Sequence, residues 1–180
     1  MKSKLFTFFV AMFALVQTAY ADTSDLTEDN VRSFYKESID VQLAGLKPTM
    51  DFMKKHTHED AKTVINVISN MAGAPQQKQT MSMNKEELLR ETQKGMEMGD
   101  LQSIESTILV LKISEDGRSA NVKDSTYSEF TMSMNAPHGV VTFLAEQSML
   151  CDSLVVLNDE GVIQSKDNNC SSEINIKPVQ

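Results

Sequence analysis

The chain has 180 residues, of which 17 are Lys or Arg and 25 are Asp or Glu, so its net charge at pH 7 is −8. An acidic chain lacks the clustered Lys and Arg that hold nucleic acids and anionic membranes, so we expect neither as a partner. Tryptophan is absent and aromatic residues are few, so the chain has few side chains that could stack on sugars or bases.

The first 21 residues have the pattern of a cleaved secretory signal peptide. Lys2 and Lys4 precede the apolar residues 5–16, and Ala19-Tyr20-Ala21 supplies the small residues of a cleavage site. This apolar run is too short to span a bilayer, so we expect no stable membrane insertion. Cleavage after Ala21 leaves 15 Lys and Arg against 25 Asp and Glu, a net charge of −10, and predicts a periplasmic or secreted protein.

Two helices are predicted at the start of the mature chain. Apolar residues recur at helical spacing from Asp25 to Leu46, and acidic residues occupy the first turn, where the helix dipole favours them. The pair Lys47-Pro48 interrupts this pattern. A shorter helix is predicted from Pro48 to about Lys55, with proline at its first position.

A hairpin and a third helix are expected next. Thr57 and Asp60 fit a capping box that would open another helix, but residues 63–68 are mostly β-branched and favour a strand. A Gly-Ala-Pro turn at 73–75 then leads to a return strand at 77–83. Asn84 is a typical cap for a helix that ends near Gly99.

Four strands joined by short turns are predicted from Leu101 to Cys170. Asp116-Gly117 is typical of a two-residue hairpin turn, which would pair Ile113 with Ala120. Residues 135–139 break the second of these strands, and the segment 158–161 forms the last turn.

The last turn also predicts a disulfide. A three-residue loop with Gly161 in the left-handed conformation sets a register in which Cys151 and Cys170 lie nearly opposite each other. A bond between them is geometrically reasonable and would persist outside the cytoplasm. The alternative is two free buried thiols.

This order of elements resembles the NTF2-like superfamily over about residues 25–167. The resemblance also rests on Phe34-Tyr35, on residues 58–61 and 84–88, and on the hairpin at 114–120. It implies an α+β fold in which N-terminal helices pack on a curved, mostly antiparallel sheet to form a cone with an internal pocket. It further implies frequent dimerisation through the sheet face and functions that range from isomerases to binding modules. Fold alone does not choose among these.

We expect one domain over residues 22–170 and a C-terminal tail over 171–180. Within the tail, Ile174 and Ile176 alternate as an extra edge strand would. Asp124, Thr126 and Ser128 share one strand face, which either lines a pocket or faces water. The candidate pocket-lining residues are Tyr35, Asp124, Thr126, Tyr127 and Phe130.

An enzymatic alternative would use an acid inside the cone beside a tyrosine. The available side chains are Tyr35, Asp51, Asp124, Tyr127 and Asp152, and their spacing does not bring them together. We therefore assign no catalytic residue. The sequence also lacks a phosphate-binding loop, a dinucleotide fingerprint and a Ser-His-Asp pattern.

Two groups of residues suggest metal binding. His56, His58, Glu59 and Asp60 form a dense cluster, which is more typical of a solvated turn than of a zinc site. Ten methionines remain after cleavage, and the string Thr-Met-Ser-Met-Asn occurs twice. The thioethers of Met81, Met83, Met132 and Met134 would suit Cu(I), whereas methionine is also a common filler of irregular cores.

We therefore expect an exported binding or interaction module without catalytic activity or cofactor. Its expected partners are a second copy of the chain, as a homodimer, and an unknown small molecule or protein. The alternatives are a lyase or isomerase that uses an acid in the cone, and a periplasmic copper-binding protein.

Overall fold

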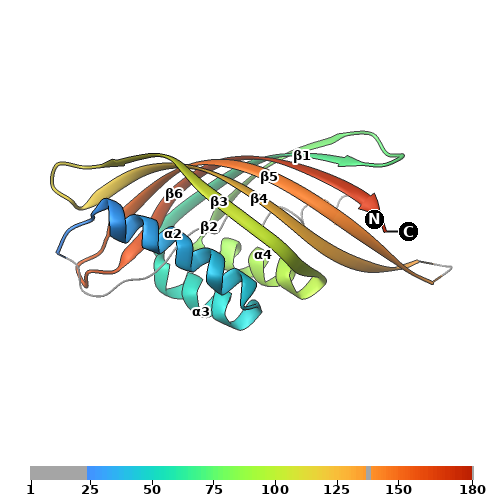
Figure 1. The fold of residues 1–180 in the computed structure, drawn as a ribbon, viewed down its shortest axis with the longest axis horizontal. Helices are drawn as coiled ribbons and strands as arrows, with labels where there is room; N and C mark the ends of the chain where they lie inside the picture. The colour runs from blue at the N-terminus through green and yellow to red at the C-terminus, as the bar shows by residue number, and fades with distance from the viewer. Residues whose placement is uncertain (1–23, 137–138, 180) are drawn as a thin grey trace.

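The computed structural model describes residues 24–136 and 139–179, so the predicted signal peptide lies outside the described residues. Within these residues, three helices pack on one face of a six-stranded, strongly curved sheet (Figure 1). The strand order is β2-β1-β6-β5-β4-β3, and only β1 and β6 pair in parallel among the described strands. The predicted α+β fold is thereby confirmed.

The first two helices are α2 (Glu28–Leu43) and α3 (Leu46–His56). Thr27 caps α2 and accepts a hydrogen bond from the backbone N–H of Asn30. Helix α3 begins two residues before the predicted Pro48, which lies within its first turn. Proline is tolerated there because the first N–H groups of a helix have no intrahelical partner.

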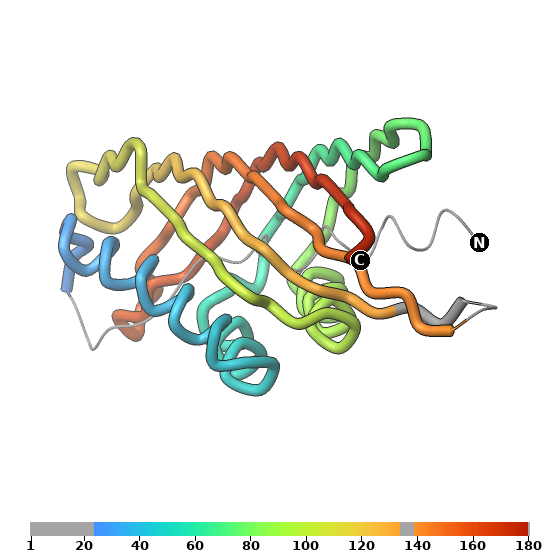
Figure 2. Tube along the Cα trace, turned by 45° about the vertical axis from the view of Figure 1, so that its right-hand side comes forward, coloured from blue at the N-terminus to red at the C-terminus, as the bar shows by residue number. Residues whose placement is uncertain are grey.

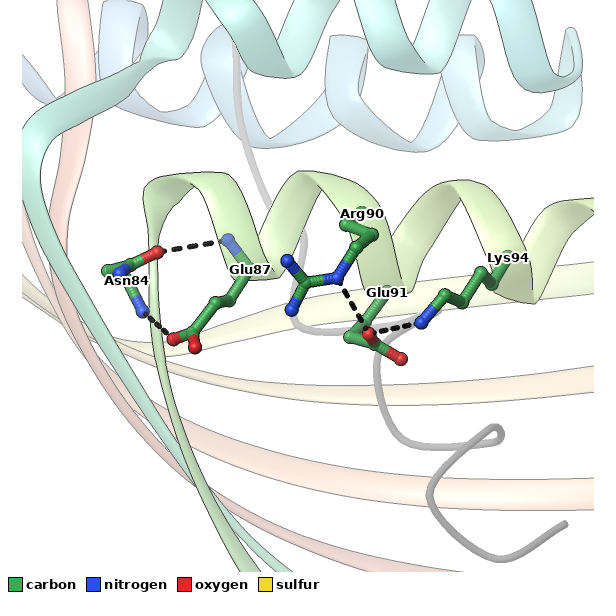
Figure 3. Close-up of polar contacts among 5 residues, drawn as sticks. All are labelled: Asn84, Glu87, Arg90, Glu91 and Lys94. Carbon is green, nitrogen blue, oxygen red and sulfur yellow. Dashed lines mark hydrogen bonds and ion pairs between the residues drawn. The ribbon is translucent and has the colours of Figure 1, made fainter. Parts of the chain in front are cut away.

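Strands β1 (Thr57–Met71) and β2 (Gln77–Asn84) form the predicted hairpin, so the alternative of a helix opening at Thr57 is wrong. Helix α4 (Lys85–Met98) follows directly. Its capping box is reciprocal: Asn84 Oδ1 accepts from Glu87 N at 2.9 Å, and Glu87 Oε2 accepts from Asn84 N at 3.1 Å (Figure 3). Caps of this kind stabilise a helix by roughly 1 kcal/mol.

The remaining strands are β3 (Gly99–Ile113), β4 (Ser119–Ala136), β5 (Gly139–Leu157) and β6 (Ile163–Pro178). Ile113 lies opposite Ala120, as predicted. The turn itself is longer than expected: Ser114 N donates to Ser119 O at 2.9 Å, so residues 115–118 form a four-residue loop. Asp116 lies inside that loop, and Gly117 has a positive φ of 66°, a conformation that glycine adopts readily.

Strand β6 corrects the predicted tail. It continues through Cys170 to Pro178 and lies between β1 and β5, so residues 171–178 belong to a central strand rather than to an extra edge strand. Ile174 and Ile176 are buried in the core. Cys151 and Cys170 are directly opposite and form the predicted disulfide.

The core has two apolar clusters on the helix-covered face of the sheet. The larger cluster packs α3 and α4 against the sheet and includes Met53, Leu88 and Phe130. The smaller one packs α2 against the other end and includes Phe34, Val122 and Ile163. Figure 2 shows α2 running beside β3, while α3 and α4 lie farther along the same face. Between the two clusters, the buried side chains of β4 are polar.

Candidate functional site: a buried polar band

The inner face of β4 changes from apolar to polar and back along its length. Because side chains alternate across a strand, the even-numbered residues from Ala120 to Met132 of β4 face the helices. Val122 at one end and Phe130 at the other belong to the two separate apolar clusters. Asp124, Thr126 and Ser128 lie between them and are buried.

Two further strands extend this polar stretch. Gln147 on β5 lies opposite Ser128, and its Nε2 donates to Ser172 Oγ on β6 at 2.6 Å. We refer to the set as the polar band, which consists of Asp124, Thr126, Ser128, Gln147 and Ser172. All five side chains are less than 5% exposed. The band therefore crosses three neighbouring strands beneath the helices.

Three atoms of the band have no hydrogen-bond partner among the described residues. They are Asp124 Oδ1, Ser128 Oγ and Gln147 Oε1. A buried polar atom left unpaired costs roughly 1–3 kcal/mol, so native proteins nearly always satisfy such atoms with protein, water or ligand. In contrast, the nearby Asn168 is satisfied on both sides, since it accepts from Ser165 Oγ and donates to Thr63 Oγ1.

The electrostatic environment of Asp124 favours its neutral form. Burial raises the pKa of this carboxyl to about 7, the Thr126 hydroxyl opposes the shift, and the negative charge of Asp152 adds to it. Asp124 thus changes charge near neutral pH. Besides its unpaired buried atoms, the band thus contains a carboxyl with a strongly raised pKa, which an ordinary apolar core does not.

A groove between α2 and β3 approaches the band from outside. Its volume is about 480 Å³, and Tyr35, Ile39 and Ser106 line it. The Thr126 hydroxyl lies 3.0 Å from Ser106 Oγ and 3.4 Å from Asp124 Oδ2, so its proton can serve either acceptor. Ser106 is therefore the polar link between the groove and the band.

A wider hollow of about 750 Å³ lies on the opposite, outer face of the sheet. Its lining includes Asn66, Ile68, Lys78, Ser148, Leu150 and Glu173. The hollow is open, and polar groups there can bond to solvent without a ligand. The inner band is the stronger candidate because its unpaired atoms are buried.

The structure separates the predicted pocket residues into two faces. Asp124, Thr126 and Phe130 face the helices, and Tyr35 lines the groove. Tyr127 does not join them: it lies on the outer face, 41% exposed, where its hydroxyl donates to Glu129 Oε1. Strand alternation explains this outcome, since an odd-numbered residue of β4 cannot share a face with Asp124.

Gln147 and Ser172 were missed by sequence reasoning. The signal for Gln147 was present, because the break at 135–139 sets a register in which Ser128 lies opposite it. Ser172 was assigned to the tail and was therefore not considered. Of the other acids, Asp51 pairs with Lys47 and Asp152 with Lys123, both in exposed ion pairs.

The histidine cluster does not converge. His56 is buried at the end of α3, and its Nδ1 lies 2.9 Å from Ile163 O. His58 accepts from the backbone N–H of Asp60, while Glu59 pairs with Lys85. No group of three or more His, Cys, Asp or Glu residues that could hold a metal occurs in the described part of the chain.

Three of the four candidate copper ligands are buried in the larger apolar cluster: Met81, Met83 and Met132. The side chain of Met134 lies outside the described part of the structure. Strands β2 and β4 are four strand spacings apart, roughly 19 Å measured along the sheet. Copper binding stays a prediction.

No protein-family model and no curated protein matches the chain. It is similar to a conserved protein from Planctomyces limnophilus, with 12% identity over 83% of this chain and 94% of that one and a TM-score of 0.48. A ketosteroid isomerase-like protein from Erwinia carotovora is 13% identical over 76% and 85%, with a TM-score of 0.39. A putative dehydratase from the NTF2-like family of Streptomyces avermitilis is 14% identical over 83% and 90%, with a TM-score of 0.36.

Proposed function

We propose that this protein is an exported binding module that holds a small polar molecule at the polar band without transforming it. The observation that carries the proposal is the set of three buried atoms without a protein partner, Asp124 Oδ1, Ser128 Oγ and Gln147 Oε1. A ligand that supplied hydrogen bonds to them would recover part of the cost of their burial.

The chemistry of these atoms limits the ligand. Gln147 Oε1 accepts hydrogen bonds only, and Asp124 Oδ1 does so whenever the carboxyl is ionised, while the Ser128 hydroxyl both donates and accepts. The two ends of the band are separated by four residues of β4, roughly 13 Å at strand geometry. An elongated molecule with N–H or O–H donors toward both ends and an apolar remainder would match the hydrogen-bonding groups of this band and the polarity of the two apolar clusters beside it.

Export is supported by two features. The signal-peptide pattern precedes Asp22, and the disulfide between Cys151 and Cys170 is compatible with an extracellular protein. No helix among the described residues is long and apolar enough to cross a membrane. N-terminal sequencing of the protein from its native host should begin at Asp22.

Native mass spectrometry tests the binding proposal. The mature protein, purified from its own compartment without denaturation, should carry an added organic mass. The variants Ser128→Ala and Gln147→Leu should retain at least about tenfold less of it, since each removes one buried hydrogen bond to the ligand. Ser125→Ala is the matched control, because Ser125 lies on the same strand but on the outer face. Equal retention by all variants would refute the proposal.

A second candidate is a lyase or isomerase in which Asp124 acts as the acid or base. The specific observation in its favour is the pKa of about 7, which is suited to proton transfer at neutral pH. Incubating the molecule recovered above with fresh protein separates the two functions. Conversion that Asp124→Asn abolishes, with binding retained, would establish the enzyme; unchanged molecule would support the binding module.

A further inference from the structure

Strand β3 is an edge strand of the sheet, and helix α2 packs beside it. The strand pairs with β4 on one side, and no other strand pairs with its second side within the described residues (Figure 1). An edge strand presents unpaired N–H and C=O groups, which are a template for a further strand. At 15 residues, β3 is long for an edge strand, whereas the other edge, β2, has eight.

The middle of β3 is apolar and exposed. The segment 107–111 reads Thr-Ile-Leu-Val-Leu, with no charged residue, no proline and high strand propensity. Leu109 is 53% exposed and Val110 is 42% exposed. The register shift between Ile108 and Val110 leaves Leu109 as the extra residue of a bulge. The most exposed apolar side chain of β3 therefore lies in the middle of this apolar segment.

Charges flank this apolar centre with opposite signs. Glu105 precedes it and Lys112 follows it, and both side chains are exposed without an ion-pair partner among the described residues. The outer face continues the pattern on β4, where Glu129 lies near Glu105, and Lys123 lies opposite Val110. The edge therefore has an acidic side chain, Glu105, on one side of the apolar segment and a basic one, Lys112, on the other.

We propose that β3 pairs antiparallel with β3 of a second copy of this chain across a two-fold axis between Ile108 and Leu109. In this register Glu105 of each copy lies opposite Lys112 of the other, which gives two equivalent charge pairs. Thr107 of each copy likewise lies opposite Val110 of the other. The bulge does not disturb the match of faces: Glu105 and Thr107 lie on the same outer face as Val110 and Lys112. The two bulges meet at the axis, where the Leu109 side chains pack together.

This dimer differs from one formed through the sheet face. It joins the two sheets edge to edge and leaves the outer hollow free, while the groove between α2 and β3 lies directly beside the new interface. Self-complementarity of this kind is what an isologous two-fold interface requires. Pairing through β3 does not require a molecule bound at the polar band.

Sedimentation velocity on the mature chain tests the pairing by charge reversal. Glu105→Lys and Lys112→Glu each place like charges opposite each other twice, so each should raise the dimer dissociation constant by about tenfold or more. The double variant Glu105→Lys/Lys112→Glu restores opposite charges and should return the constant close to the wild-type value. Circular dichroism of each variant confirms that it is folded.

A second pair of variants distinguishes the edge from the face. Leu109→Asp should give monomers, whereas Leu150→Asp, at an exposed site on the outer face of β5, should leave the dimer unchanged. The proposal is overturned by a monomeric wild type at every concentration, by a dimer insensitive to the single reversals, or by dissociation in Leu150→Asp alone.

Discussion

Cys151 lies directly opposite Cys170 because one extra residue in β6 shifts the strand register between the turn and the disulfide. Near the turn, Leu157 pairs with Ile163 and Val155 with Ser165, which would place Asn169 opposite Cys151. Leu154 instead pairs with Asp167, so Lys166 is the extra residue, and every later pair moves by one. The turn alone would leave the two cysteines one residue out of register, and the bulge at Lys166 brings them directly opposite each other.

Removing this disulfide should destabilise the protein. For the double variant Cys151→Ala/Cys170→Ala, we expect the free energy of unfolding to fall by about 3 kcal/mol, because the unfolded chain is no longer closed into a loop of 19 residues. Urea denaturation under non-reducing conditions measures the change. The reduced wild-type protein serves as a control and should show a similar loss; an unchanged urea midpoint would contradict the prediction.

The contribution of Asp124 to the stability of the protein should fall as the pH rises from about 4 to 7. Its pKa is about 7 in the folded chain, above the ordinary value of 3.8, so the folded state binds this proton more tightly than the unfolded state. The resulting stabilisation is complete below pH 3.8 and is lost as the pH passes 7, and its full size is roughly 4 kcal/mol. Asp124→Asn should remove this slope and be more stable than the wild type at about pH 8. Parallel slopes in the two proteins would exclude Asp124 as the cause.

His56 should act in the opposite direction. Burial lowers its pKa from 6.5 to about 4, so the folded state favours the neutral ring, whose Nδ1–H donates to Ile163 O. This stability is present above pH 6.5 and is lost as the pH falls toward 4. His56→Asn places an amide N–H near the same carbonyl but does not titrate. In an Asp124→Asn background, which lacks the opposing slope of Asp124, His56→Asn should therefore reduce the change of the urea midpoint between about pH 7 and 5, and an equal change with and without His56 would contradict this account.

Gly117 should tolerate substitution poorly for two reasons. Its φ is +66°, and an added Cβ would lie 3.0 Å from Cβ of Asp25. Gly117 O also accepts from Leu26 N at 2.7 Å, so the turn holds the segment that leads into α2. Gly73 is the matched control, since its φ is +78° but nothing lies within 4 Å. Gly73→Ala should lower the melting temperature through backbone strain of roughly 1–3 kcal/mol, and Gly117→Ala should lower it further. Equal losses would show that the contact with Asp25 is unimportant.

Local signals predicted most of the fold. The cap at Asn84, the β-branched run after Ala61 and the loop ending at Gly161 each act within a few residues. Sequence reasoning therefore located the elements that they start or end. The placement of β6 was not predictable in this way. Its parallel pairing with β1 joins segments about 100 residues apart, and no turn connects them to set a register.

The site was only partly predictable for the same reason. Alternation placed Asp124, Thr126 and Ser128 on one face, and the same rule, applied to Tyr127, would have excluded it. Whether this face of β4 is buried or exposed to solvent depends on how the three helices pack over it. The contribution of Gln147 and Ser172 depended on the order of strands, which only the folded chain reveals.

The most direct test of ligand binding at the polar band is a crystal structure of the protein purified natively, at a resolution that shows individual waters. We predict density for an organic molecule within hydrogen-bond distance of Gln147 Oε1 and Ser128 Oγ, extending toward Asp124. A band in which ordered waters alone satisfy these atoms, or in which the helices pack onto it without any bound molecule, would contradict the account.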